Sequence, residues 1–292
     1  MNSIQPIFLL FALIVALSGC KTSEPVNLKA LEKVQEKVLA IESYGTEEIG
    51  KNEPELKKKE TSVLAKSYTS GYQLGNRMVN LDFWKKGKGL TLVNLHDNEN
   101  TSVEAALALV DSLGGRILQL KHTGERNIQF TLAATNFEID PNRIFTDTGT
   151  KATLIRYSQF SENAHREVRA LARQIVDSLD RHMIVTLHNN SEDNYSSLSY
   201  LDEYKTDAAA VYINPNRDPD DFFFVTTRDL FDQFKKLGYN TVLQNNETMT
   251  DDGSLSVLAG HQDIPYINVE AQHGHLKEQI EMLFVLVKVL EK

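Results

Sequence analysis

The sequence predicts one α/β domain over residues 66–292, in which helices flank a mostly parallel, mixed β-sheet. Apolar runs of strand length alternate there with longer segments whose apolar residues recur at helical spacing, and this alternation indicates strands joined by helices. The runs Leu92–Leu95 (LVNL) and Met183–Leu187 (MIVTL) are almost continuously apolar. Central strands of a parallel sheet have this composition because helices cover both of their faces.

The expected elements follow one another from residue 90 onwards. The predicted strands are Leu90–Leu95, Arg116–Lys121, Asn127–Leu132, Met183–Leu187, Ala209–Ile213, Asn240–Leu243 and Tyr266–Val269. The predicted helices are Thr101–Leu113, Glu162–Leu179, Asp220–Lys236 and His275–Leu290. Sites in such sheets form just beyond the carboxyl ends of strands, so the residues that end a strand are the candidates for function.

Residues 1–19 predict a signal peptide, because the eleven apolar residues Ile7–Leu17 are too few to span a bilayer. They lead into Leu-Ser-Gly-Cys, which resembles a bacterial lipobox whose cysteine, here Cys20, becomes the acylated N-terminus. No Lys or Arg precedes the apolar run, which leaves an ordinary signal peptide or a short anchor helix as alternatives. An acylated Cys20 anchors the protein as a lipoprotein on the periplasmic or cell-surface side of a bacterial membrane, with the outer membrane favoured.

Residues 20–65 predict a membrane tether. Asn27 can cap a short helix, and a stretch broken by Gly, Pro and charged residues follows it. The stretch suits a spacer that lifts a domain off the membrane, and a partner-binding helix is the alternative.

The composition excludes two classes of function. Cys20 is the single cysteine, so an acylated chain has no free thiol, and a metal site must use His, Asp or Glu. The formal net charge is −9, from 31 Lys and Arg against 40 Asp and Glu, and no basic stripe is present that could neutralise phosphates. We therefore expect neither thiol catalysis nor a nucleic-acid partner.

The spacing His-x-x-Glu occurs three times, beginning at His96, His122 and His275. The pair at His275 opens the last helix, where a carboxylate in the first turn is favourable, and the pair at His122 lies in a polar turn. His96 and Glu99 instead follow the most apolar strand and precede an amphipathic segment. A strand-to-loop transition can aim both side chains at one point, as two zinc ligands require, although the spacing alone decides nothing.

Three further groups lie at the ends of predicted strands or in turns. His188 follows the strand MIVTL and is either a hydrogen-bonded rim residue or a third ligand, since two imidazoles and a carboxylate leave one zinc position open for water. Asn142 and Arg143 follow a turn and can grip a carboxylate. Glu270 closes the last strand, where a carboxylate forms an ion pair or acts as a general base.

In chain order these groups are His-x-x-Glu, Asn-Arg, His and Glu. The series resembles the zinc carboxypeptidase (M14) superfamily, with its succinylglutamate desuccinylase and aspartoacylase relatives, over about residues 90–290. The resemblance implies a zinc carboxypeptidase-like fold that binds one Zn²⁺ per chain. The implied zinc ligands are His96, Glu99 and His188.

The resemblance also implies roles for the remaining groups. Asn142 and Arg143 would bind the terminal carboxylate of a substrate, and Glu270 would activate water. The family uses an arginine to stabilise the oxyanion shortly before the Asn-Arg pair, and Arg126 is a loose match for it.

Parts of the family pattern are absent. The first motif is HDNEN, so Asp97 stands where the family has Gly, and Asn189 stands where a small residue is usual. The substrate-facing tyrosine of the family has no clear counterpart; the available residues are Tyr195, Tyr200, Tyr204 and Tyr239. A second pair, Asn216–Arg217, is expected to form a strand-to-helix turn. His273 and His275, near Glu270, are expected to support the site.

The function implied by the resemblance is zinc-dependent hydrolysis of an amide bond next to a free carboxylate, on cell-wall or other peptides. An N-acyl amino acid amidohydrolase or deacylase is one alternative, and a non-catalytic carboxylate-binding lipoprotein is another. The expected partners are a carboxylate-bearing peptide or N-acyl amino acid and, through the lipid anchor, a membrane.

Overall fold

The computed structural model describes residues 66–192 and 194–291. The predicted signal peptide, the lipidation site Cys20 and the tether lie outside these residues. Among the described helices, none combines the length and the apolar character needed to cross a membrane.

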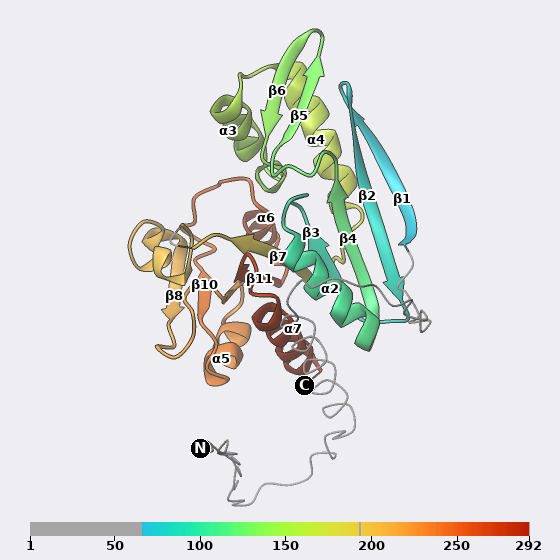
Figure 1. The fold of residues 1–292 in the computed structure, drawn as a ribbon. Coiled ribbons are helices and arrows are strands. Elements are labelled where there is room, and N and C mark those ends of the chain that lie inside the picture. Colours follow the sequence, from blue (N-terminus) through green and yellow to red (C-terminus); the bar gives the residue numbers. More distant parts are fainter. Residues whose placement is uncertain (1–65, 193, 292) are drawn as a thin grey trace, which may run out of the picture. The chain divides into compact units, whose positions relative to one another are not determined.

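A mixed sheet of nine strands forms the centre of the described domain (Figure 1). Its strands are β1 (Lys66–Leu74), β2 (Arg77–Lys86), β3 (Thr91–Asn94), β4 (Gly115–Lys121), β7 (Ile184–Asn190), β8 (Ala208–Tyr212), β9 (Phe222–Val225), β10 (Thr241–Gln244) and β11 (Tyr266–Gln272). They lie in the order β1-β2-β4-β3-β7-β11-β9-β10-β8.

The middle of this sheet is parallel. Strand β3 pairs with β4 and β7, and β7 pairs with β11, all in parallel. On one side β2 pairs antiparallel with β4, and the edge strand β1 pairs antiparallel with β2. On the other side β9 pairs antiparallel with β11, β10 pairs parallel with β9, and the edge strand β8 pairs antiparallel with β10. The carboxyl ends of β3, β7 and β11 therefore meet at one edge. The fold confirms the predicted α/β class with its mixed sheet and its buried central strands.

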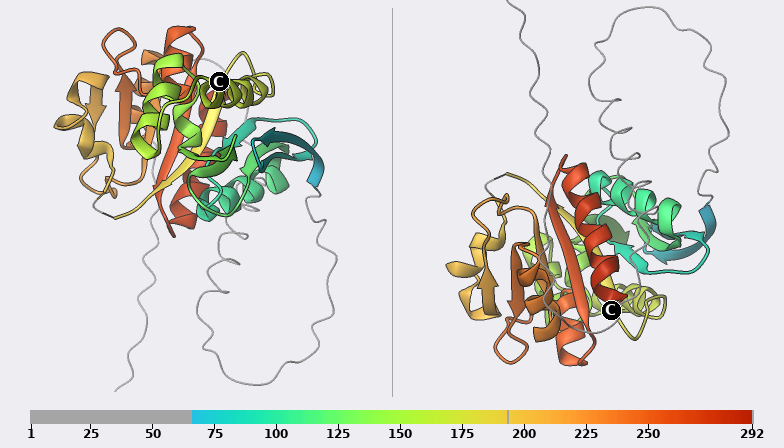
Figure 2. Two further views of the ribbon diagram at one scale, coloured as in Figure 1. Left: turned by 90° about the horizontal axis from the view of Figure 1, so that it is seen from above. Right: turned by 90° about the horizontal axis from the view of Figure 1, so that it is seen from below.

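Helices cover both faces of the sheet. One set is α2 (Asn100–Leu113), α5 (Arg228–Lys236) and α7 (Leu276–Leu290), and the other is α3 (Asp147–Tyr157), α4 (Glu162–Val176) and α6 (Leu255–His261). Figure 2 shows α2 and α7 side by side, and they pack over a core separate from the one beneath α4. A hairpin of β5 (Ile128–Leu132) and β6 (Thr135–Ile139) forms a second, two-stranded sheet beside α3 and α4.

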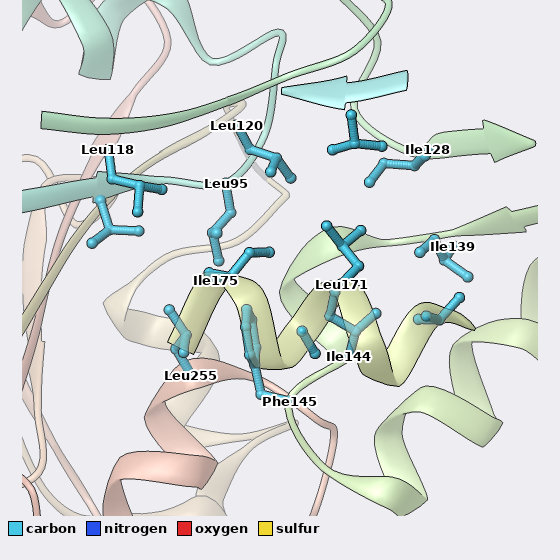
Figure 3. Close-up of a cluster of buried hydrophobic side chains, with 14 of the residues drawn as sticks. Leu95, Leu118, Leu120, Ile128, Ile139, Ile144, Phe145, Leu171, Ile175 and Leu255 are labelled. Atoms are coloured by element: carbon cyan, nitrogen blue, oxygen red, sulfur yellow. The ribbon is translucent and has the colours of Figure 1, made fainter. Parts of the chain in front are cut away.

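Helix α4 illustrates how the sequence pattern produces this packing. Its buried residues are Ala164, Val168, Leu171, Ala172 and Ile175, which recur at the spacing of one helix face. The Ser161 hydroxyl accepts the Ala164 N–H and caps the helix. Figure 3 shows Leu171 and Ile175 facing side chains of the sheet, and each such burial contributes about 1.5–3 kcal/mol.

The predicted helix Asp220–Lys236 is wrong at its start. Residues Phe222–Val225 form β9, a fully buried strand between β11 and β10, and helix α5 begins only at Arg228. The four side chains alternate between the two cores, which a strand can do and one face of a helix cannot. The pair Asn216–Arg217 accordingly leads into a strand.

Other elements were not foreseen from the sequence. The predicted strand Asn127–Leu132 exists as β5, but it lies in the hairpin and not in the main sheet. The hairpin β1–β2, strand β6 and helices α3 and α6 were not among the predicted elements, although Val79, Leu81 and Phe83 of β2 alternate with polar residues. Their placement depends on contacts with distant segments.

Candidate metal centre and substrate cavity

Two neighbouring strands bring the three predicted ligands together. His96 follows β3, Glu99 directly precedes α2, and His188 lies near the end of β7, which pairs with β3. The His96 Nδ1 atom lies 2.7 Å from Glu99 Oε1, and the His188 Nδ1 atom lies 3.0 Å from Glu99 Oε2. All three side chains are buried.

The separations suit a divalent metal. The two Nδ1 atoms of His96 and His188 are 3.2 Å apart, and one ligand atom from each of the three residues falls within 4.8 Å of the others. Two atoms that each lie about 2.0–2.1 Å from zinc at the tetrahedral angle are about 3.3 Å apart. Two imidazoles and one carboxylate are also the donor types of a catalytic zinc site with an open position. The residues therefore fit the implied Zn²⁺.

The charges at this cluster are strongly coupled. Burial alone would lower the pKa of His96, but Glu99 and Asp140 outweigh it and raise that pKa to about 9. Burial would raise the pKa of Glu99, yet His96 and His188 hold it well below its usual range. For His188, burial prevails and lowers the pKa. A proton on His96 thus occupies the position that a metal would take.

Asp140 is a functional residue that the sequence reasoning missed. Its Oδ1 atom lies 2.8 Å from His96 Nε2, which orients the ring so that Nδ1 faces Glu99. The same oxygen accepts the Asn142 N–H at 2.8 Å and caps the short 3₁₀ turn Pro141–Arg143. Burial would raise the pKa of Asp140, but His96 and Arg143 hold it far below the usual value. Only its place in the turn Asp-Pro-Asn was visible in the sequence.

Glu270 lies beside the ligands because of the strand register. In the parallel pair β7–β11, Glu270 is the Cα partner of His188. Its carboxylate is buried, and its Oε2 atom accepts a hydrogen bond from Asn268 Nδ2 at 2.8 Å. Burial and, to a lesser extent, Glu99 raise the pKa of Glu270 to about 8, although Asn268 acts in the opposite direction. A carboxyl group of this kind can exchange a proton near neutral pH.

Asn142 and Arg143 lie next to this cluster. Asn142 Nδ2 is 3.4 Å from His188 Nε2, and Arg143 Nη1 donates to the Asn142 carbonyl oxygen at 2.9 Å. The Nε atom of Arg143 lies 3.5 Å from an Asp252 carboxylate oxygen. The next residue, Gly253, has a φ of +82°, and a Cβ there would lie 2.5 Å from the Arg143 carbonyl oxygen. Only glycine fits this close approach without strain.

Arg126 reaches the cluster from the connection between β4 and β5. Its Nη1 atom donates to Glu99 Oε1 at 2.8 Å. The connection is held by Asp97, whose Oδ2 atom accepts the N–H groups of His122 and Gly124, both at 2.7 Å, and which also forms an ion pair with Lys121. Asp97, the departure from the family motif, thus anchors the loop that carries Arg126.

One cavity of about 1020 Å³ connects these groups. The predicted ligands, the glutamate, the candidate oxyanion-stabilising arginine and the two candidate substrate-binding residues all contribute to its wall, namely His96, Glu99, His188, Glu270, Arg126, Asn142 and Arg143. A cavity of this volume can hold a small peptide. Arg143 and the ligand cluster share it, so one negatively charged substrate can contact both.

Three of the four candidate tyrosines line this cavity: Tyr195, Tyr200 and Tyr204. The hydroxyls of Tyr195 and Tyr200 are 2.5 Å apart. The fourth, Tyr239, contributes no part of the cavity wall among the described residues, and its hydroxyl donates to Glu281. The cluster near residue 200 is therefore the one that a substrate could touch.

The other sequence candidates lie elsewhere or support the site. His122 lies in the β4–β5 turn, and His275 precedes α7 with its Nδ1 atom 3.0 Å from an Asp221 oxygen. His273 lines the cavity. Arg217 forms an ion pair with Glu281 at 3.1 Å and does not line the cavity described here.

Solved structures of other proteins are similar to this chain. The murein-tripeptide amidase MpaA from Escherichia coli O157 is similar, with a TM-score of 0.40, 14% identity, and coverage of 73% of this chain and 87% of that chain. A metallo-carboxypeptidase from Burkholderia cenocepacia is similar with a TM-score of 0.38, 12% identity, and coverage of 79% of this chain and 66% of that one.

The similarity is distant. No protein-family model matches the chain, and no curated protein matches it. We therefore base the functional assignment on the residues and geometry of the cavity.

Proposed function

We propose that the protein is a zinc-dependent hydrolase that cleaves an amide bond next to a free carboxylate, in the manner of a carboxypeptidase. One observation carries the proposal: a His-Glu-His donor set, a buried glutamate and an Asn-Arg pair line the same cavity. Each group supports one part of such a reaction, and the cavity brings the parts within reach of one substrate.

In the proposed reaction each group has one role. Arg143 and Asn142 bind the free carboxylate of the substrate and so place its amide carbonyl beside His96 and His188. Zinc held by the donor set supplies a Lewis acid that polarises the carbonyl and lowers the pKa of water. Glu270 accepts a proton from the attacking water and passes it to the leaving amine.

Arg126 takes a further part in the proposed reaction. Its guanidinium lines the cavity and contacts Glu99 at 2.8 Å, so a positive charge lies close to where negative charge develops on the carbonyl oxygen. Fixed charges of this kind stabilise an oxyanion because they need no reorganisation during the reaction.

The deciding experiment compares Glu270→Gln with the parent chain loaded with zinc. We expect kcat to fall by about 10³-fold or more, because the proton acceptor is lost, while zinc content stays unchanged. Glu203→Gln is the matched control, since Glu203 also lines the cavity but has no assigned role. Unchanged activity in Glu270→Gln would refute the proposal.

A second assay distinguishes the proposed carboxypeptidase from the two alternative functions. Short peptides with a free C-terminus, the same peptides with an amidated C-terminus, and N-acyl amino acids are offered to the zinc-loaded protein. Hydrolysis of the free peptides alone supports a carboxypeptidase, and hydrolysis of N-acyl amino acids alone supports the deacylase. Carboxylate binding without zinc supports the non-catalytic lipoprotein.

We further propose that Cys20 is acylated and anchors the protein on the periplasmic or cell-surface side of a bacterial membrane. The lipobox-like sequence before Cys20 supports this location. Cys20→Ala should move the protein from the membrane fraction to the soluble fraction and abolish labelling by a fatty-acid analogue. Retention in the membrane without labelling would indicate an uncleaved anchor helix instead.

A further inference from the structure

A row of buried polar side chains lies beneath Glu270 on β7 and β11. Thr186 is the Cα partner of Asn268, two residues along each strand from the pair His188 and Glu270. The exposed fractions of Thr186, Asn268 and Glu270 are 0%, 6% and 4%. Tyr266, two residues before Asn268, is 2% exposed. Polar groups buried this deeply persist where every one of them is hydrogen-bonded.

Hydrogen bonds join these groups into one chain. Asn268 Nδ2 donates to Glu270 Oε2 at 2.8 Å, Thr186 Oγ1 donates to Asn268 Oδ1 at 3.2 Å, and the Tyr266 and Thr186 hydroxyl oxygens are 2.6 Å apart. No step in this chain involves the donor set His96, Glu99 and His188.

The chemistry of the groups fixes the direction of each bond. An ionised carboxylate only accepts, so Asn268 must present its NH₂ to Glu270 and its oxygen to Thr186. Thr186 then donates its single hydroxyl hydrogen to Asn268, so Tyr266 must be the donor in its bond with Thr186. The chain therefore has one consistent arrangement while Glu270 is ionised.

This arrangement distinguishes the two oxygens of Glu270. Oε2 is occupied by the Asn268 bond, which leaves Oε1 to exchange a proton in the cavity. A carboxylate fixed by one oxygen also loses freedom to rotate away from the reacting water, and misplacement by about 1 Å can cost about 10²-fold in rate.

We propose that Asn268 is a positioning residue for Glu270 and that Thr186 and Tyr266 orient its amide. The inference rests on the proposed role of Glu270 as the proton acceptor. Asn268 also lines the cavity, but the scheme assigns it no contact with the substrate or the metal ligands and a single role, which it exerts through the carboxylate.

The kinetic test removes the links one at a time in the zinc-loaded full-length chain. We expect kcat to fall by about 30- to 100-fold in Asn268→Ala, by about 5-fold in Thr186→Val and by about 2-fold in Tyr266→Phe, with KM and zinc content unchanged. In a Glu270→Gln background, Asn268→Ala should lower kcat no further. The matched control is Asn240→Ala, because Asn240 is equally buried but hydrogen-bonds the Asp218 carbonyl.

Two kinetic results would overturn the inference: a parental kcat in Asn268→Ala, or a loss that persists after Glu270 has been replaced. Loss of zinc in Asn268→Ala would also count against it, since it would mark a general structural role. If the parent chain hydrolyses no amide at all, the proposed function fails, and the positioning is tested without activity.

The activity-free test measures urea unfolding of the metal-free protein in a double-mutant cycle. Asn268→Ala and Glu270→Ala should be coupled by about 10-fold in the unfolding equilibrium constant, because each single change removes the same bond. Additive effects would show that the two side chains do not interact, and would overturn the inference on their own.

Discussion

The candidate site consists of two halves that are built differently. The strand half, formed by His96, His188 and Glu270, lies at the ends of paired strands. The loop half, formed by Arg126 and Arg143, lies on connections outside the sheet. The His96 side chain is 1% exposed, whereas those of Arg126 and Arg143 are 47% and 36% exposed.

The difference teaches how each half is held in place. Backbone register fixes the strand half, because β3, β7 and β11 are hydrogen-bonded neighbours with defined Cα partners. The loop half has no such register and depends on carboxylates: Asp97 holds the loop before Arg126, and Asp252 pairs with Arg143. Changes in the strand half should therefore abolish the site, and changes in the loop half should weaken it.

The largest effect is expected from His96→Ala. Zinc stoichiometry, measured by atomic emission on the purified chain, should fall from about one per chain to near zero, and activity should fall with it. The matched control is His275→Ala, since His275 has the same His-x-x-Glu spacing but contacts Asp221. Full zinc content in His96→Ala would show that the metal lies elsewhere. It would also refute the expectation that changes in the strand half abolish the site.

A smaller effect is expected from Arg143→Ala. Two charge-assisted hydrogen bonds to a substrate carboxylate are lost, so kcat/KM should fall by about 10²- to 10³-fold, with zinc content unchanged. Substrates with an amidated terminus should lose little. Arg217→Ala is the matched control. Arg217 also follows an asparagine, but it forms an ion pair with Glu281 and does not line the cavity. An equal loss on free and amidated substrates would exclude carboxylate binding by Arg143.

The strand half should also make the metal-free protein sensitive to pH through Glu270. Its pKa is about 8 in the folded protein and 4.5 in the reference state. A raised folded-state pKa gives stability that is fully present below about pH 4.5 and is lost as pH rises through 8. Glu270→Gln carries no such charge, so at pH 9 it should be more stable than the parent by at most about 5 kcal/mol, the value that the full pKa shift gives.

The measurement is urea unfolding in the presence of a chelator at several pH values. The parent should lose stability between about pH 5 and 9 relative to Glu270→Gln, whereas Glu278→Gln, on helix α7, should follow the parent. Parallel profiles for the parent and Glu270→Gln would show that burial does not hold a proton on this carboxyl group.

The same two halves explain how far the sequence could be interpreted. Strand ends are visible because apolar runs stop there, so His96, His188 and Glu270 could be selected as candidates before their proximity was known. Arg143 was selected from its place beside a turn, whereas Arg126 was found only through the resemblance to a family. The helix at Asp220 failed because the acidic residues and the following Phe222–Val225 fit a helix start locally, while the two cores on either side of the sheet require a strand.

The roles of two carboxylates that hold the site, one in each half, were not visible in the sequence. Asp140 looked like part of a turn, and Asp97 looked like a mismatch to the family motif. Their partners, the His96 ring and the N–H groups of the β4–β5 turn, are 44 and about 25 residues away along the chain. A contact of this range is decided by the tertiary fold, which no local pattern encodes.

Asp97→Ala tests this dependence and should give the smallest effect. The N–H groups of His122 and Gly124 lose their acceptor, so the turn loosens and Arg126 no longer lies reliably beside Glu99. We expect kcat/KM to fall by about 10-fold and the free energy of unfolding by about 1–3 kcal/mol, with zinc content retained. Asp180→Ala is the control, since Asp180 accepts the His182 N–H in a turn before β7. If Asp97→Ala instead lost its zinc, the β4–β5 turn would belong to the same rigid unit as the strand ends, and the two halves would not be separable.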